Sequence, residues 1–291
     1  LETALGDGAR AVEAWRQALS ARPDFEDAFV SIERLLEEQG RFPELADILE
    51  KHAESTLDSD ARKTLARRVA VLQETTLRDR DRAIAAWRAV LDLDDGDAEA
   101  LAALVRLHTS AEDWRGLLEV LARQIELAPD PTTRRNLRFT TARVFDEKLA
   151  DASEAASALR AILDESPEDR EALLVLEALL AREARHEDLL EVLDRRAQLE
   201  SQPADRDAVA FRAAELVTRE LGDVTGGLDR YREILERTRS HAGARAALWA
   251  LARGEDYRAQ AIAALEPVLR ETSAWDEMAE LLELKVTTQD A

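Results

Sequence analysis

The 291-residue sequence has no cysteine, only 10 glycines and 7 prolines, and few aromatic residues (4%). Without cysteine the chain can form no disulfide and has no thiol nucleophile or thiolate metal ligand. No stretch approaches the roughly 18 consecutive apolar residues of a membrane-spanning helix, so we expect no membrane insertion. Sustained alternation of apolar and polar β-branched residues is also missing, which argues against half-buried strands.

Positive charge is scarce as well. The 40 Lys and Arg residues stand against 61 Asp and Glu, which gives a net charge of −21. Because phosphate binding depends on clustered cations, this balance disfavours nucleic acid as a partner. It is compatible with a basic partner and also with a merely solvated surface. The basic residues are nearly all arginine, and Asn136 is the only asparagine. That bias suggests a GC-rich bacterial genome, and we expect a soluble protein of the bacterial cytoplasm or periplasm.

The abundant residues are Ala, Leu, Glu and Arg, which are strong helix formers. Apolar residues make up 46% of the chain, which is enough to pack a core and too much for a disordered chain. We therefore expect an almost wholly α-helical protein.

The sequence repeats at a constant spacing. A bulky anchor residue followed by arginine recurs without one slip, and the anchors are Trp15, Trp87, Leu159 and Tyr231. Each step, such as that from Trp15 to Trp87, covers 72 positions and is called one repeat length below. The anchors share bulk and not chemistry, which is typical of a packing position between neighbouring helical hairpins. A repeat of this kind predicts stacked helical units, and we expect about sixteen helices in all.

Each unit is expected to hold two hairpins. In the first unit the helices run from about residue 8 to 21, 24 to 39, 42 to 55 and 59 to 77. An aspartate precedes the first helix of every unit as its N-cap. These residues are Asp7, Asp79, Asp151 and Asp223. Gly40 is expected to end the second helix in the left-handed conformation.

The units span about residues 7–78, 79–150, 151–222 and 223–291, and no linker separates them, so we expect a single domain. The last unit departs from the pattern. Residues 257–261 can be read as its third helix with one residue deleted. Residues 275–282 match the third helix better, which makes residues 255–271 an inserted helix. Because Leu1 falls in the last turn of a repeat helix, we also expect the chain to be a fragment of a longer array.

The hairpins resemble the tetratricopeptide repeat (TPR). The second helix of that family carries a small residue, an aromatic residue four positions later, a second small residue and then proline. Ala11, Trp15, Ala18 and Pro23 match this pattern position for position, and Leu159 replaces the aromatic residue in the third unit. Equivalent positions alternate between a shorter and a longer spacing, and the shorter one is the family period. The resemblance extends over the whole chain and is specific for the fold.

The resemblance implies a right-handed superhelical α-solenoid of antiparallel hairpins that binds a peptide or protein in its concave groove. The fourth helix of each unit should face that groove. Candidate partner-binding residues on these helices are Arg62, Arg134, Arg206, Phe139 and Phe211. Arginine pairs bidentately with carboxylates. Local salt bridges for the arginines and core packing for the phenylalanines are the alternative roles.

A second row of arginines follows the anchors directly, at Arg16, Arg88, Arg160 and Arg232. In the last three units an acidic residue stands four positions later, and these residues are Asp92, Asp164 and Glu236. We expect exposed ion pairs within each helix, worth ~0.3–0.5 kcal/mol each.

No motif for catalysis or cofactor binding is recognisable. The acidic run from Asp92 to Asp97 does not fit a calcium loop, because Leu91 and Leu93 stand where the first two oxygen ligands belong. It aligns instead with the helix-to-helix turns at Pro23 and Pro167. The four histidines are scattered, with no second ligand in register. We therefore expect no metal, no cofactor and no enzymatic activity.

The first hypothesis for function is a non-catalytic scaffold that binds protein or peptide partners along the curved surface of the array. The alternative is an architectural spacer or self-assembling segment of a larger bacterial scaffold. RNA binding, a third hypothesis, conflicts with the charge. The sequence indicates neither the identity of the partner nor the oligomeric state.

Overall fold

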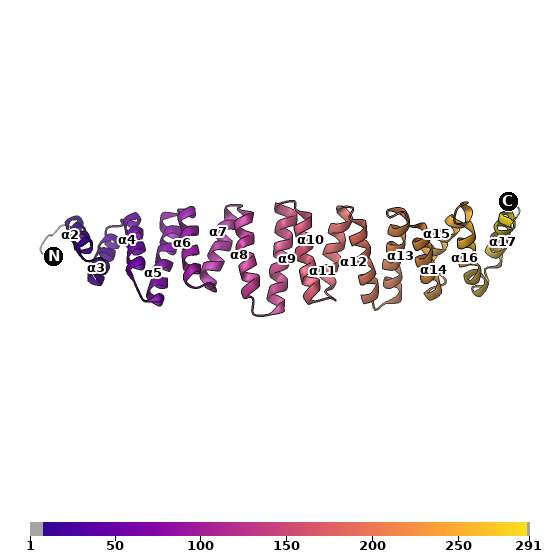
Figure 1. The fold of residues 1–291 in the computed structure, drawn as a ribbon, viewed down its shortest axis with the longest axis horizontal. Coiled ribbons are helices and arrows are strands. Elements are labelled where there is room, and N and C mark those ends of the chain that lie inside the picture. The colour runs from indigo at the N-terminus through magenta and orange to yellow at the C-terminus, as the bar shows by residue number, and fades with distance from the viewer. Residues whose placement is uncertain (1–7, 290–291) are drawn as a thin grey trace. The chain divides into compact units, whose positions relative to one another are not determined.

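The computed structural model describes residues 8–289, and within them the chain consists of α-helices α2 to α17 without any strand (Figure 1). Two compact units divide it, one up to Leu137 and one from Arg138 onward. Consecutive helices pack against one another from α2 to α8 in the first unit and from α10 to α17 in the second. The expected all-α architecture of stacked helical hairpins, an α-solenoid, is confirmed. The right-handed superhelix stays a prediction.

The first unit begins with the four helices of the first sequence repeat. They are α2 (Gly8–Ala21), α3 (Glu26–Glu38), α4 (Phe42–Ser55) and α5 (Ser59–Val71). The last turn of the predicted fourth helix is a π-helix, η1 (Leu72–Leu77). The unit continues with α6 (Arg80–Leu93), α7 (Ala98–Ser110), α8 (Trp114–Leu127) and the start of α9 (Pro131–Lys148).

The second unit contains the rest of α9 and the remaining helices. They are α10 (Ala152–Glu165), α11 (Arg170–Arg182), α12 (His186–Leu199), α13 (Pro203–Arg219), α14 (Val224–Arg237), α15 (Ala242–Arg253), α16 (Arg258–Glu271) and α17 (Trp275–Gln289).

The predicted aspartate caps are present at the start of α6, α10 and α14. The side chains of Asp79, Asp151 and Asp223 each accept a hydrogen bond from the backbone N–H three residues on, which satisfies one of the free donors of a helix N-terminus. Asp7 lies outside the described residues. A second row of caps went unpredicted. Asp97, Asp169 and His241 do the same at the start of α7, α11 and α15.

Left-handed residues mark the tight turns inside the hairpins. In the described part the residues with positive φ are Gly40, Arg78, Glu112, Ala150, Ala184, Gly222 and Ser273. The first six are separated by a longer and a shorter spacing in alternation, as the sequence repeat predicts. At Gly40 the N–H of Arg41 reaches back to the carbonyl of Leu36 at 3.0 Å, so the turn satisfies a free helix carbonyl.

The fourth repeat fits two registers. Helix α16 begins one repeat length after α12, and it buries Ala261, Ala264 and Leu265 at the places of three buried residues of α12. This favours a regular third helix. The repeat would, however, place the next left-handed residue after Gly222 at Asp256, whereas it is Ser273. This favours an insertion before α17. The inserted helix near residues 255–271 stays a prediction.

Candidate functional site

Three of the four repeat anchors have no surface to offer a partner. Trp87, Leu159 and Tyr231 are 1%, 1% and 2% exposed on α6, α10 and α14. Trp15 on α2 is half-buried, and its ring meets that of Phe25 edge-on at a centroid distance of 6.1 Å. The anchors thus lie where neighbouring hairpins pack.

The polar neighbour of the anchor changes with the anchor. Glu74 accepts a hydrogen bond from the indole Nε1 of Trp87 at 2.9 Å. Two repeat lengths after Glu74, the hydroxyl of Thr218 lies 3.5 Å from that of the fourth anchor, Tyr231. The third anchor is leucine, which cannot donate, and Asp146, one repeat length after Glu74, forms an ion pair with Arg182 instead.

Two of the candidate partner-binding arginines cap helices. The guanidinium of Arg62 donates to the carbonyl of Thr56, at 3.1 Å from Nε and 2.8 Å from Nη2. Arg134 donates in the same way to Ala128 at 3.1 Å. Thr56 and Ala128 end α4 and α8, where helix carbonyls lack intrahelical partners. Arg206 lines a pocket described below. A partner contact for these arginines stays a prediction.

The two candidate phenylalanines take part in core packing. Phe139 is half-buried against the core around α10 to α12. Phe211 is half-buried as well, with ring centroids 5.7 Å from Tyr231 and 5.3 Å from His241. Gly243 makes room for it, because a Cβ at this glycine would lie 2.9 Å from Cζ of Phe211.

The arginines that follow the anchors pair across helices, and the predicted pairs with Asp92 and Asp164 are wrong. The observed pairs are Arg16 with Glu44 at 2.6 Å, Arg88 with Glu119 at 3.1 Å and Arg160 with Asp188 at 2.8 Å. Arg232 does lie 3.7 Å from Glu236 of its own helix. In the first three repeats an acid on the next-but-one helix comes within reach, and the arginine joins two hairpins rather than two turns of one helix.

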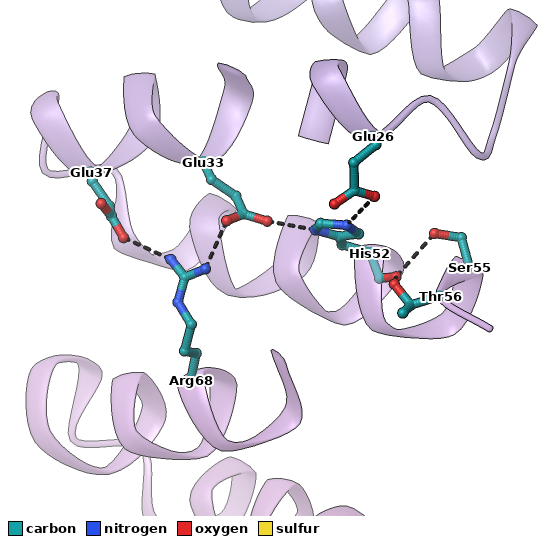
Figure 2. Close-up of polar contacts among 7 residues, drawn as sticks. All are labelled: Glu26, Glu33, Glu37, His52, Ser55, Thr56 and Arg68. Carbon is teal, nitrogen blue, oxygen red and sulfur yellow. Dashed lines mark hydrogen bonds and ion pairs between the residues drawn. The ribbon is translucent and has the colours of Figure 1, made fainter. Parts of the chain in front are cut away.

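A buried polar cluster ties α3, α4 and α5 together. Figure 2 shows Glu33 between His52 and Arg68, at 2.7 Å from Nδ1 of His52 and 2.8 Å from Nη1 of Arg68. The other ring nitrogen of His52 lies 3.0 Å from Glu26, and Phe29 stacks on the imidazole at a centroid distance of 4.3 Å. Burial opposes the charge on Arg68, yet the hydrogen bond to Glu33 raises its pKa above the ordinary value.

The same cluster recurs two repeat lengths later. Glu177 is buried and forms ion pairs with Arg196 and, at 2.6 Å, with Arg212. Because each carboxylate is enclosed and paired on both oxygens, these clusters are interior bracing between hairpins and not a site open to a ligand.

Two pockets also recur two repeat lengths apart. The α5 pocket, of about 720 Å³, lies between α4 and α6 over α5. Its lining residues are Asp47, Glu50, Ala53, Glu54, Arg62, Ala66, Val69, Arg82, Ala85, Ala86, Ala89 and Leu93. The α13 pocket, of about 550 Å³, lies between α12 and α14 over α13. Its lining residues are Asp194, Ala197, Gln198, Arg206, Ala210, Arg230, Glu233, Ile234 and Arg237.

The α5 pocket escaped prediction, apart from Arg62. Its acidic side chains come from α4 and its alanines from α6, so no local motif marks it. The signal that could have found it is a comparison of residues two repeat lengths apart, where Glu50 matches Asp194 but Ala86 stands in the place of Arg230.

The acidic turn after α6 serves the fold. Asp94 accepts from Lys63 at 2.9 Å, and Asp97 caps α7 and forms an ion pair with Arg67. In the described part of the chain, no group of three or more His, Cys, Asp or Glu side chains is arranged to hold a metal ion. None of the described helices combines the length and apolar character needed to cross a membrane.

Comparison with known proteins finds the tetratricopeptide-repeat family model in residues 100–135. No curated protein matches the chain. Among solved structures, Naa15/Naa10 bound to HypK-THB is 19% identical with a TM-score of 0.44, over 89% of this chain and 39% of that one. The chain thus spans about two fifths of that relative.

Two further structures are similar over most of their own length. YrrB, described as a TPR protein with an unusual peptide-binding site, is 14% identical with a TM-score of 0.33, over 81% of this chain and 98% of that one. The C-terminal part of a TPR repeat-containing protein from Cytophaga hutchinsonii is 12% identical with a TM-score of 0.33, over 83% of this chain and 94% of that one. The sequence repeat, its helical hairpins and the matched segment support a TPR-like helical-repeat family.

Proposed function

We propose that the chain is a non-catalytic scaffold that binds a protein or peptide partner. The observation that carries this proposal is the array itself. Within each compact unit the hairpins pack on their sequence neighbours and leave their lateral surface exposed, as is typical of repeat proteins that bind extended partners. The conspicuous side chains support the same reading, because the buried anchors and the clusters around Glu33 and Glu177 are engaged in packing.

The part of the surface that binds is a further proposal. The resemblance to the TPR family points to a concave groove, and the candidate residues for it are Arg62, Arg134, Arg206, Phe139 and Phe211. The guanidinium groups of Arg62 and Arg134 already hold helix ends, so backbone and neighbouring side chains on α5 and α9 would make most of a contact there.

A selection from a random peptide library tests this function. The chain is immobilised and challenged with displayed peptides, and an unrelated acidic protein of similar net charge serves as the control. We expect peptides with a shared motif to be enriched on the chain and not on the control. Failure to enrich any motif, or enrichment equal to that on the control, would refute the proposal.

An architectural role remains the second candidate because of the outer face of α17. Trp275, Leu282 and Val286 are exposed on this helix at positions i, i+7 and i+11, which place them on one side. An apolar stripe of this kind favours association with another helix. Light scattering over a concentration series distinguishes the roles. A monomer whose mass does not change with concentration speaks against self-assembly, whereas a dimer lost in Leu282→Glu supports it.

A further inference from the structure

The α5 and α13 pockets are two versions of one site. Eight lining positions correspond at an offset of two repeat lengths. The pairs are Glu50 and Asp194, Ala53 and Ala197, Glu54 and Gln198, Arg62 and Arg206, Ala66 and Ala210, Ala86 and Arg230, Ala89 and Glu233, and Leu93 and Arg237. Each pocket has an acid on the preceding helix and an arginine and an alanine on its floor. They differ in what the third helix contributes.

In the α13 pocket the chain supplies its own cation to the acid. Arg230 on α14 binds Asp194 on α12 through two parallel contacts, Nη1 to Oδ1 at 2.6 Å and Nη2 to Oδ2 at 2.8 Å. This is the bidentate fork that arginine forms with a carboxylate. The hydrogen bond to Asp194 raises the pKa of Arg230, so the guanidinium is held firmly in its charged form.

In the α5 pocket that cation is missing. Ala86 stands in the place of Arg230, and Glu50 has no hydrogen bond or ion pair within the described part of the chain. The Glu50 side chain is exposed at the rim of the pocket. Partial burial and the negative charge of Asp47 raise its pKa, while the charge of Arg82 opposes the rise. Arg82 also lines this pocket, and its guanidinium lies 3.9 Å from Asp47 and 3.9 Å from Asp79.

The space left by the missing side chain is apolar. Where the α13 pocket has Glu233 and Arg237, the α5 pocket has Ala89 and Leu93, and its volume is about 720 Å³ against about 550 Å³. Methyl groups below an acidic rim suit a long side chain with an aliphatic stem and a cationic head.

We propose that the α5 pocket binds an arginine side chain of a partner protein, with its guanidinium on Glu50 as that of Arg230 lies on Asp194. The stem of the arginine packs on Ala86 and Ala89. This assignment rests on the proposed scaffold function and adds the chemistry of the partner, a segment with an exposed arginine. An anion is the wrong occupant because Asp47, Glu50 and Glu54 line the rim, while the guanidinium of Arg62 is taken by the carbonyl of Thr56. Lysine is less suitable because it lacks the planar fork seen in the α13 pocket.

Three single substitutions test the assignment, and their effects on arginine binding are compared. Ala86→Arg gives the α5 pocket its own cation, Arg230→Ala removes the cation from the α13 pocket, and Glu50→Gln removes only the charge of the acid. The probe is N-acetyl-arginine amide, and its citrulline analogue is the matched neutral control. Binding is followed by amide chemical-shift changes in the full chain, because these locate the site as well as the affinity.

In the wild type we expect saturable shifts confined to α4 to α6, with a Kd on the order of millimolar for a single side chain. Ala86→Arg should abolish them. Glu50→Gln should weaken binding about tenfold, the typical loss for one charged hydrogen-bonding partner. Arg230→Ala should add a second set of shifts in α12 to α14. Circular dichroism checks that each variant is folded, and Glu50→Gln decides the matter should Ala86→Arg not fold.

Four outcomes would each overturn the assignment. They are equal shifts with the citrulline analogue, shifts located outside α4 to α6, no shifts at all, and binding by Glu50→Gln as tight as that of the wild type. Its failure is distinguishable from failure of the scaffold function. Library peptides that lack arginine and still bind Ala86→Arg would leave the function standing without this pocket. A library that enriches nothing removes the function itself.

Discussion

Replacing Glu177 with valine is expected to destabilise the second compact unit by about 3 kcal/mol. The Glu177 side chain is 8% exposed and neutralises two arginines, Arg196 and Arg212. Removing one member of a buried ion pair leaves an uncompensated charge, which costs roughly 3–5 kcal/mol. The lower end applies because Arg212 is half-exposed and Arg196 also lies 3.7 Å from Glu200.

The array itself suggests the compensating change. One repeat length earlier the three positions of the cluster are uncharged. These residues are Val105, Gln124 and Thr140. The triple variant Glu177→Val, Arg196→Gln and Arg212→Thr removes the carboxylate together with both arginines, so that no buried charge is left without a partner. Buried ion clusters are often neutral in net stability when replaced as a whole. We expect the triple variant to lie within about 1 kcal/mol of the wild type.

Hydrogen exchange of the α11 to α13 amides is the suitable assay, because repeat arrays open locally and a single global midpoint would average over the units. Urea unfolding followed by circular dichroism serves as the second measurement. The reasoning would be refuted by a single Glu177→Val variant that loses less than about 1 kcal/mol, or by a triple variant that loses as much as the single one.

Three further predictions concern other parts of the fold. Trp87→Ala should cost ~3–5 kcal/mol because the indole is fully buried, and an unchanged melting curve would contradict that role. Gly227→Ala should cost about 1–3 kcal/mol because its Cβ would overlap the hydroxyl oxygen of Thr218, and Thr218→Ala in the same chain should restore much of the loss in urea unfolding. The N–H of Gly116 lowers the pKa of Asp113, with desolvation opposing. A carboxyl group whose pKa is lower in the folded state stabilises the fold at pH values above its unfolded pKa of about 4, and this stabilisation is lost as the pH falls through the folded pKa. The stability advantage of the wild type over Asp113→Asn should therefore shrink between pH 5 and 2.

The helices were predictable because their signals are local. The first and third predicted helices coincide with α2 and α4, since the apolar stripe and the end signals agree there. The second begins two residues later than predicted. The chain turns after Pro23, where the N–H of Phe25 donates to the carbonyl of Arg22 at 3.2 Å, and the helix therefore begins only at Glu26. The π-helical turn at the end of α5 has no sequence signal that we recognise.

The ion pairs were not predictable in the same way, because their distances depend on how hairpins stack. Arg88 has Asp92 one turn away and still pairs with Glu119 of α8. His52 appeared as a scattered histidine and proves to be enclosed between two carboxylates, since both partners come from α3 and lie far away in sequence.

The repeats provide an internal comparison that separates three kinds of residue. Residues that stay the same from unit to unit, such as the capping residues Asp79, Asp151 and Asp223, serve the fold. Residues that change together, as Glu74 and Trp87 become Thr218 and Tyr231, serve packing.

The third kind changes without its partner. The pocket with the acid Asp194 also has the arginine Arg230. One repeat length earlier both are missing, because Ala122 stands in the place of the acid and Ala158 in the place of the arginine. The first repeat alone among these three keeps the acid, Glu50, and omits the arginine. The Glu50 side chain is exposed at the pocket rim, and partial burial and the negative charge of Asp47 raise its pKa. An exposed acid without the arginine of its repeat counterpart is where the proposed partner arginine would bind, so we expect the partner contact at the α5 pocket rather than at the buried anchors.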